Sequence, residues 1–126
     1  MPSALTVDRH DAGVVLLTLA LPDKRNAMTA ELTAEWGETV ASLKGDRSVR
    51  CVVVTGAGKA FCAGGDVSWL ASEPDASPAD LRDRMLPFYT TWLSLRALDV
   101  RLDEAQLARL DEIFPGYRPA PMEYAW

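Results

Sequence analysis

The chain has 126 residues, of which 48% are hydrophobic and 25% are charged, a composition typical of one small globular domain. A formal net charge of −5 and a pI near 4.8 argue against a nucleic-acid-binding surface. No apolar stretch reaches the roughly 18 residues of a membrane-spanning helix. The N-terminus lacks the basic start and apolar run of a signal peptide, so we expect a cytosolic protein.

Residues 5–21 predict a β-hairpin. Residues 5–10 alternate weakly between apolar and polar side chains, residues 11–13 predict a turn, and residues 14–21 predict a second strand. A polar loop follows and carries the cations Lys24 and Arg25. Because cations are common in exposed turns, a solvated turn is one interpretation of this pair.

An amphipathic helix is predicted from Thr29 to Gly45. The negative charge of Glu31 in the first turn interacts favourably with the helix dipole, and Gly45 ends the helix. Residues 50–55 contain three consecutive valines, which fit a buried strand better than a helix. Apolar residues recur at helical spacing and predict one core-facing stripe: Met28, Leu32, Trp36, Val40 and Leu43.

After this strand, the sequence predicts a loop whose backbone comes close to another molecule. The adjacent glycines Gly64 and Gly65 permit positive φ angles, so a main-chain N–H can be aimed outward. Asp66 suits the N-cap of a short helix that begins at Val67. The positive end of that helix would stabilise an oxygen that becomes negative during a reaction. A tight turn between a strand and a short helix is the alternative interpretation.

Two nucleotide-binding motifs begin like this loop, and neither is completed. The dinucleotide fingerprint requires a third glycine where Phe61 stands. A P-loop requires glycine at Val53 and serine or threonine at Ala60. Cys51 and Cys62 lack the spacing of a metal site, so we expect reduced thiols and no bound metal.

A long helix is predicted from Ser77 to about Leu98. Ser77 is its N-cap, Pro78 occupies the first helical position, and Asp80 is the acidic residue at the third. One side of this helix is apolar, which predicts a core face or a cover over a bound chain. The residues of this side are Leu81, Met85, Phe88, Trp92 and Leu95.

The C-terminal segment predicts another helix and a proline-rich tail. Leu102 and Leu107 suit a hydrophobic staple around the capping box formed by Asp103 and Gln106. The Pro-Gly dipeptide at 115–116 ends this helix.

Two segments of the sequence match motifs of one family. Residues 58–67, GKAFCAGGDV, resemble the G-x-x-F-[CS]-A-G-x-D-[LIV] signature of the crotonase superfamily, the enoyl-CoA hydratase/isomerase family. Residues 22–28, PDKRNAM, resemble its earlier P-x-x-[RK]-N-A-[LM] motif. The two blocks occur in the family's order, with a predicted helix and a predicted strand between them.

The resemblance implies an α/β fold, namely a truncated crotonase-like fold of stacked ββα units with additional C-terminal helices. It divides the chain into a crotonase-like N-terminal region, residues 1–100, and a non-family helix and tail, residues 101–126. The tail is weakly similar to the C-terminal tail of an aldo/keto reductase, and a gene fusion, a frameshift or a sequence-assembly artefact would each produce such a junction. In the family, the region of the long helix borders the substrate pocket, which makes Met85, Phe88 and Trp92 candidate lining residues.

The resemblance also implies a site. In the family, two backbone N–H groups polarise the thioester carbonyl of an acyl-CoA and hold the developing enolate, and Gly65 matches the first donor. Lys24 and Arg25 lie near the 3′-phosphoadenosine end and the pantetheine arm, and their charge suits phosphate. Coenzyme A is part of the substrate, so no separate cofactor is expected. The other residues expected to bind the substrate are Ala27, Ala63, Gly64, Asp66 and Val67.

Two hypotheses about function stay open. The family's second donor and its acid–base glutamates lie beyond the matched region, and Glu73 and Asp75 are not positioned as a pair. The chain is either an enoyl-CoA hydratase/isomerase or a truncated, catalytically inactive fragment that binds coenzyme A. An oxidoreductase, to which the tail points, has no cofactor loop here. In a fold of stacked ββα units, each unit buries an apolar face against the next, so a truncated stack leaves one such face exposed. We therefore also expect marginal stability or self-association.

Overall fold

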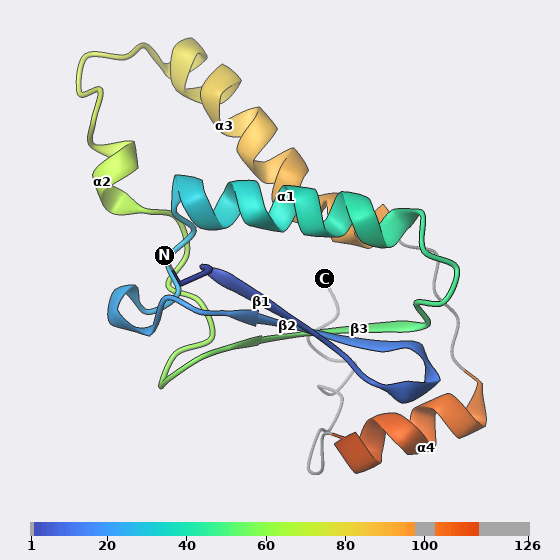
Figure 1. Cartoon of the computed structure of the whole chain (residues 1–126). Helices are drawn as coiled ribbons and strands as arrows, with labels where there is room; N and C mark the ends of the chain where they lie inside the picture. Colours follow the sequence, from blue (N-terminus) through green and yellow to red (C-terminus); the bar gives the residue numbers. More distant parts are fainter. Residues whose placement is uncertain (1, 98–102, 114–126) are drawn as a thin grey trace, which may run out of the picture.

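The computed structural model describes residues 2–97 and 103–113 of the chain. Within these residues, one sheet contains the strands β1 (Leu5–Arg9), β2 (Val14–Leu19) and β3 (Cys51–Gly56), in that spatial order (Figure 1). β1 runs antiparallel to β2, and β3 runs parallel to β2. The predicted hairpin and the predicted valine-rich strand are confirmed.

The hairpin of β1 and β2 ends slightly earlier than predicted. Leu5 pairs with Leu19, and a short 3₁₀-helix, Asp11–Gly13, forms the connecting turn. β2 ends at Leu19, and two residues later the Leu21 carbonyl accepts a hydrogen bond from the Asn26 N–H at 2.9 Å. This bond bends residues 21–26 back on themselves.

Helix α1 (Ala30–Lys44) covers one face of the sheet. Thr29 is its N-cap, and the Thr29 hydroxyl oxygen accepts a hydrogen bond from the Leu32 N–H at 3.2 Å. Gly45 ends the helix as predicted, although its φ of −86° is right-handed. Met28 precedes the helix and is half-buried. The rest of the predicted stripe is buried: Leu32, Trp36, Val40 and Leu43.

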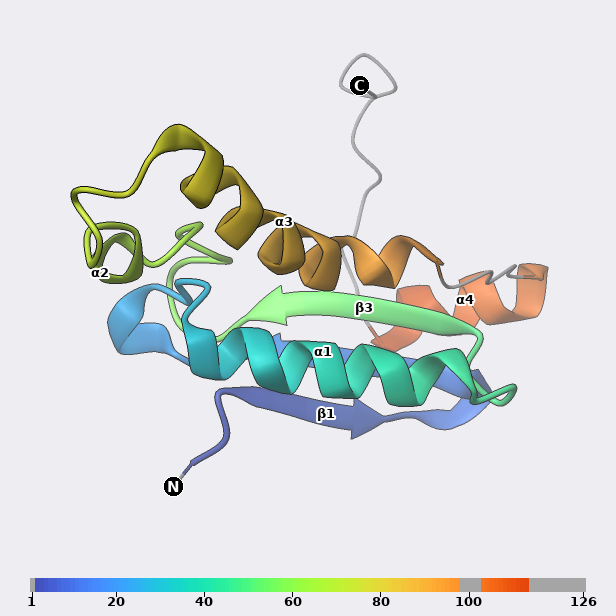
Figure 2. The ribbon, with the colours of Figure 1, turned by 90° about the horizontal axis from the view of Figure 1, so that it is seen from above.

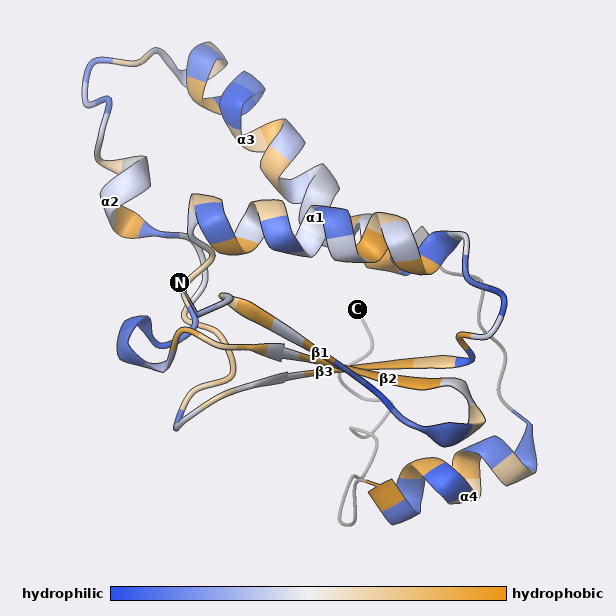
Figure 3. Ribbon diagram, in the orientation of Figure 1, coloured by the Kyte–Doolittle hydropathy of each residue, from blue (hydrophilic) through white to orange (hydrophobic). Residues whose placement is uncertain are grey.

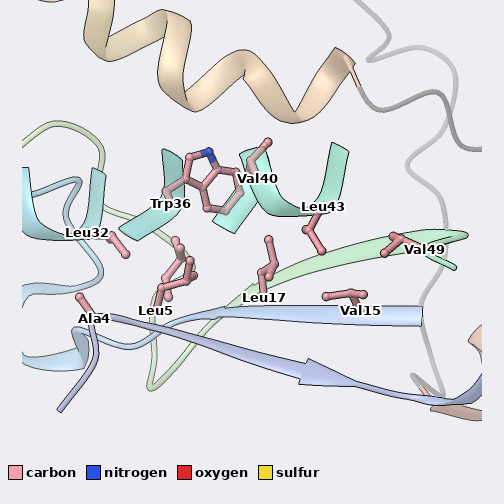
Figure 4. Close-up of a cluster of buried hydrophobic side chains, with 10 residues drawn as sticks. Ala4, Leu5, Val15, Leu17, Leu32, Trp36, Val40, Leu43 and Val49 are labelled. Carbon is pink, nitrogen blue, oxygen red and sulfur yellow. The ribbon is translucent and has the colours of Figure 1, made fainter. Parts of the chain in front are cut away.

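The hydrophobic core lies between α1 and the sheet (Figure 4). In Figure 3, hydrophobic and hydrophilic residues alternate along α1, as expected for a helix with one buried side. Fully burying one such side chain stabilises the fold by about 1.5–3 kcal/mol. The buried cluster contains Ala4, Leu5, Val15, Leu17, Leu19, Leu32, Trp36, Val40, Leu43 and Val49.

β3 lies at one edge of the sheet. Among the described residues, no strand pairs with its outer side. Val52 and Val54 pack against the core, while Val53 points to the opposite face and is half-buried. A strand with apolar residues on both faces is typical of the interior of a parallel sheet.

Two helices follow the glycine-rich loop. α2 is a single turn, Val67–Leu70. α3 (Pro78–Leu93) begins with the predicted capping box, in which the Ser77 hydroxyl and the Asp80 carboxylate each bond the other residue's backbone N–H. The chain then continues as a 3₁₀-helix, Ser94–Ala97.

α3 packs beside α1 and not directly on the sheet. Seen from above, β3 runs between the two helices (Figure 2). No described residue of α3 is fully buried, so its predicted apolar stripe is half-buried, not a core face. Trp92 and Leu95 still contact the core cluster. Among the described residues, no helix is both long enough and apolar enough to cross a membrane.

α4 (Glu104–Ile113) lies near the turn between β1 and β2 (Figure 1). Its predicted capping box is confirmed, because the Asp103 N–H donates to Gln106 and the Gln106 N–H donates to Asp103, at 3.0 and 2.8 Å. The guanidinium of Arg109 lies 2.7 Å from the Asp11 carboxylate. Some predicted features fall outside the described residues: the helix end at Leu98, Leu102 of the staple, and residues 114–126 with their predicted stop and tail.

Candidate functional site

The two motif segments meet at one end of the sheet. Because β2 and β3 are parallel, their C-terminal ends reach the same edge, and the loops that follow them are neighbours. The Ala57 N–H donates to the Leu19 carbonyl at 2.8 Å, which joins the loops where they begin. We call residues 20–29 the first loop and residues 57–66 the second loop.

Asn26 joins the two loops through its buried side chain. The residue is 0% exposed, and its Oδ1 accepts a hydrogen bond from the Leu21 N–H at 2.9 Å. Its Nδ2 donates to the carbonyls of Ala57 and Ala60, at 3.0 and 2.8 Å. The sequence predicts only a polar loop around Asn26 and does not reveal this contact. The signal that points to it is its place in the first motif.

A backbone hydrogen bond joins the loops a second time. The Met28 N–H donates to the Gly64 carbonyl at 2.8 Å, and Met28 and Gly65 form an isolated parallel bridge. The first loop therefore holds the second loop near its start through Asn26 and near its end through Met28.

This bridge determines where the Gly65 N–H points. The Gly64 carbonyl and the Gly65 N–H belong to one trans peptide group, in which the two bonds point in opposite directions. Since the carbonyl is directed at Met28, the Gly65 N–H is directed away from it. No hydrogen bond between described residues uses this N–H. The predicted donor therefore lies on a fixed backbone and has no partner among the described residues.

The turn before the donor requires glycine. Gly64 has a φ of +92°, a left-handed conformation that other residues rarely adopt, as the sequence predicted for the glycine pair. The Cys62 sulfur accepts a weak hydrogen bond from the Gly64 N–H at 3.4 Å. Both Cys62 and Cys51 are free thiols, and burial raises the pKa of Cys51.

Asp66 is the N-cap of α2, as predicted. Its carboxylate accepts hydrogen bonds from the Ser68 N–H at 3.0 Å and from the Ser68 hydroxyl at 2.6 Å. These bonds lower the pKa of Asp66, and the bond from the Ser68 hydroxyl has the larger effect. The nearby charge of Lys24 lowers this pKa further. α2 has four residues, as expected for a short helix that begins at Val67, and so few aligned peptide groups give a small dipole at Gly65.

Lys24 and Arg25 are exposed on the first loop. Lys24 ends a short 3₁₀-helix, Pro22–Lys24, and Arg25 has a φ of +52°. Neither side chain forms an ion pair with another described residue. Both cations are therefore accessible to an anionic ligand at the end of the sheet that carries Gly65.

The remaining predicted site residues lie in the same two loops and at the start of α2. Ala27 is half-buried, Ala63 is exposed, and Val67 is 75% exposed. The structure thus gathers all of the predicted site residues at one end of the sheet: Lys24, Arg25, Ala27, Ala63, Gly64, Gly65, Asp66 and Val67.

The acidic residues after α2 are not arranged for acid–base catalysis. A carboxylate oxygen of Glu73 lies 3.1 Å from the guanidinium of Arg84, and this guanidinium also lies 4.5 Å from the ring centre of Trp69. Asp75 is exposed on the loop that follows. Within the described part of the chain, no three or more His, Cys, Asp or Glu residues form a group that could hold a metal ion.

A cavity of about 460 Å³ lies between α1 and α3, next to the first loop. Of the three residues that the family resemblance suggested for a substrate pocket, Phe88 lines this cavity, whereas Met85 and Trp92 do not. The lining is largely apolar, and Arg84 is its charged residue. The complete lining is Met28, Ala30, Thr33, Ala34, Gly37, Trp69, Arg84, Pro87, Phe88 and Thr91.

Comparison with known proteins identifies the family. The family model of enoyl-CoA hydratase/isomerase matches residues 9–100 of the chain, which include both loops. The chain belongs to the enoyl-CoA hydratase/isomerase family.

Relatives of this family share a substantial part of the sequence. A probable enoyl-CoA hydratase of Mycobacterium tuberculosis is 40% identical over 99 residues, which are 79% of this chain and 36% of that protein. The 1,2-epoxyphenylacetyl-CoA isomerase of Escherichia coli is 34% identical over 79 residues, 63% of this chain and 30% of its own length. The chain therefore spans about a third of the length of these enoyl-CoA hydratase/isomerase relatives.

Solved structures support the predicted fold. An enoyl-CoA hydratase of Mycobacterium smegmatis superimposes with a TM-score of 0.67 at 35% identity, over 77% of this chain and 37% of that one. A probable enoyl-CoA hydratase/isomerase of Mycobacterium abscessus superimposes with a TM-score of 0.61 at 29% identity, over 78% of this chain and 37% of that one. The predicted crotonase-like α/β fold is confirmed, and the chain carries part of it.

Proposed function

We propose that this chain binds the thioester end of an acyl-CoA and that the Gly65 N–H donates a hydrogen bond to the thioester carbonyl. The observation that supports the proposal is the orientation of this N–H. It points away from Met28, it has no partner among the described residues, and it lies in the family's second motif.

The chemistry of the thioester explains why a fixed backbone donor would matter. When a proton leaves the carbon next to the carbonyl, negative charge develops on the carbonyl oxygen. An N–H that is already oriented stabilises this charge without reorganisation, and removing one such donor typically lowers the rate by about 10²–10³. Gly65 would thus stabilise the enolate more than the bound substrate.

The charges around the loops fit the rest of the ligand. Coenzyme A carries several phosphate charges, whereas the chain as a whole has a net charge of −5. Lys24 and Arg25 are exposed cations beside the second loop, and we propose that they bind these phosphates. Ala27, Ala63, Gly64, Asp66 and Val67 would contact the adenosine and pantetheine parts through backbone and apolar groups. The cytosolic location stays a prediction.

Binding without turnover is the second candidate function, and the environment of Glu73 favours it. Hydration of an enoyl thioester requires acid and base groups within hydrogen-bond reach of the substrate. Glu73, the first acidic residue after α2, is already paired with Arg84 at 3.1 Å. We therefore expect the isolated chain to polarise a bound thioester but not to hydrate it.

Calorimetric titration with acetyl-CoA and with free coenzyme A tests the proposal. The wild-type chain should bind acetyl-CoA in the micromolar range and more tightly than free coenzyme A, because only acetyl-CoA has the thioester carbonyl. A Gly65→Pro variant lacks the N–H and should bind the two ligands equally. Gly45→Ala is the control, since a methyl group there meets no atom within 4 Å. A folded wild-type chain that binds neither ligand would refute the proposal.

A hydration assay then separates the two candidate functions. With crotonyl-CoA as the substrate, we expect no turnover above the uncatalysed rate. Turnover that disappears in Gly65→Pro would show instead that this chain is an active enoyl-CoA hydratase, and residues other than Glu73 would have to supply the acid and the base.

A further inference from the structure

The side chain of Asn26 binds three backbone groups, one in the first loop and two in the second. Its amide oxygen accepts from the Leu21 N–H at 2.9 Å, and its amide nitrogen donates to Ala57 at 3.0 Å and to Ala60 at 2.8 Å. The residue is 0% exposed, so water does not compete for these bonds. Two of these three hydrogen bonds join the first loop to the second, and the third holds Asn26 within the first loop.

The geometry around Asn26 tolerates little change. A methyl group on Gly56 would lie 2.6 Å from the Asn26 amide nitrogen and 2.3 Å from the Phe61 carbonyl oxygen. Asn26 itself has a φ of +55°, and asparagine is among the residues that adopt this left-handed conformation most readily. Both the backbone and the side chain at this position thus favour asparagine.

The Asn26 contacts lie at the start of the second loop, and the Met28 contact lies at its end. Between Ala60, which accepts from Asn26, and Gly64, which accepts from Met28, the chain has few residues in which to change direction. A shift of Ala60 would therefore move the Gly64–Gly65 peptide group. This group carries the Gly65 N–H.

We propose that Asn26 is a positioning residue: by holding the start of the second loop, it fixes, together with the Met28 bridge, the direction of the Gly65 N–H toward the thioester carbonyl. This inference rests on the proposed function, because it assigns to Asn26 the orientation of the donor used there. Asn26 does not touch the substrate in this arrangement. It acts through the carbonyls of Ala57 and Ala60.

An amide is required for this role because one side chain must both accept and donate. Aspartate has the same shape and still accepts from the Leu21 N–H, but an ionised carboxylate cannot donate to Ala57 and Ala60. Two carbonyl oxygens would then face a negative charge. Asn26→Asp is therefore the sharpest variant, since it changes the hydrogen bonds and hardly changes the volume.

The test uses an acyl-CoA whose acyl group is 4-(dimethylamino)cinnamoyl. Its absorption moves to longer wavelength when a hydrogen bond polarises the carbonyl, so one titration gives both the affinity and the polarisation. For Asn26→Asp we expect most of the red shift to disappear, while the affinity falls about tenfold or less, the equivalent of one lost hydrogen bond. A protein that has merely lost stability would bind less ligand but polarise the bound ligand normally.

The pH dependence of the variant gives an independent signature. Burial between two carbonyls raises the pKa of the new carboxyl group, and its neutral form donates one hydrogen bond. As the pH falls through that pKa, part of the red shift should return in Asn26→Asp. The wild-type protein, measured at the same pH values, should show no such recovery.

Val49→Ala is the matched control. Val49 lies in the core at the opposite end of the sheet from the loops (Figure 4), and its truncation lowers stability without touching them. This variant should keep the full red shift. An Asn26→Asp protein that is folded and also keeps the full red shift would overturn the role of Asn26 but leave the role of Gly65 intact. Absence of ligand binding by the wild-type chain would overturn both.

Discussion

The indole rings of Trp36 and Trp92 stack with their centres 4.7 Å apart, and this contact attaches α3 to the helix that covers the sheet. Trp36 is 3% exposed in the core, and the Trp92 ring nitrogen donates to the Thr33 hydroxyl at 3.1 Å. Because no described residue of α3 is fully buried, the position of α3 depends strongly on these contacts.

We predict that Trp92→Ala destabilises the protein by about 2 kcal/mol, because it removes the stacking contact, apolar burial and one hydrogen bond. The free energy of unfolding is measured by urea denaturation. Leu86→Ala is the control on the same helix, since Leu86 is 64% exposed and should matter little. Equal stability of the two variants would show that α3 is held by other contacts.

Most of the fold was predictable because its elements are local and periodic. The apolar stripe of α1 recurs at helical spacing, and Thr29 and Gly45 mark its ends in the sequence as they do in the structure. The three valines of β3 fit a buried strand better than a helix, and they form one. The half-buried state of α3 was not predictable in this way, since helical periodicity does not tell whether a helix packs on a sheet or beside another helix.

The sequence predicted the backbone donor of the candidate site, the Gly65 N–H. It did not predict the contacts that hold the loop carrying this donor. The glycine pair indicates an unusual backbone conformation, and Gly64 has it. Asn26 and Met28 contact the second loop across more than thirty positions of sequence, and no local pattern reveals such hydrogen bonds. A polar residue in a polar loop looks solvated until the fold buries it.

Gly56 is predicted to be intolerant of any side chain. In Gly56→Ala, the new methyl group would lie 2.3 Å from the Phe61 carbonyl oxygen and 2.6 Å from that of Ala60, and these backbone atoms cannot move independently. We expect a loss of about 2–3 kcal/mol, as for overpacking of a rigid site. Thermal unfolding followed by circular dichroism measures this loss.

Gly45 is the control position for Gly56. An added methyl group there meets no atom within 4 Å, and the φ angle of Gly45 is −86°. Gly45→Ala should leave stability unchanged or raise it by about 0.5 kcal/mol, because alanine restricts the unfolded chain. If both variants lost similar stability, the close approach at Gly56 would not be the cause.

The stability of the N-terminal segment should depend on pH through Glu35. Its carboxylate accepts hydrogen bonds from the Ser3 hydroxyl at 2.5 Å, the Leu5 N–H at 2.9 Å and the Ala4 N–H at 3.2 Å. These hydrogen bonds lower the pKa of Glu35 from its ordinary value of 4.5. The bond from Ser3 is the largest cause, and the two backbone bonds contribute less. A carboxyl group whose pKa is lower in the folded than in the unfolded chain stabilises the fold at pH values above its ordinary pKa. This stabilisation is lost as the pH falls through the pKa of the folded state.

Urea denaturation of wild-type protein and Glu35→Gln, from pH 7 down to pH 3, measures this contribution. At pH 7 we expect the variant to be about 1 kcal/mol less stable, because neutral hydrogen bonds replace charge-assisted ones. The difference should shrink as the pH falls below about 4.5, where Glu35 becomes protonated in the unfolded chain. A difference that stays constant over the whole range would contradict this explanation.

The two edges of the sheet differ in how well they resist pairing with another chain. β1 carries the charged residues Asp8 and Arg9, whereas β3 carries three consecutive valines and no charge. Among the described residues, no strand covers the outer edge of β3. Exposed apolar edges pair with other strands, and charged side chains prevent such pairing. We therefore expect self-association through β3.

Sedimentation velocity over a range of protein concentrations measures this association. Val53→Lys places a charge on β3, on the face opposite α1, and should shift the protein toward the monomer. Thr6→Lys adds the same charge to β1, where Thr6 is already exposed, and should leave the association unchanged. Equal effects of the two lysines would indicate that net charge, not the β3 edge, controls the association. A wild-type chain that stays monomeric at high concentration would show that the β3 edge is protected.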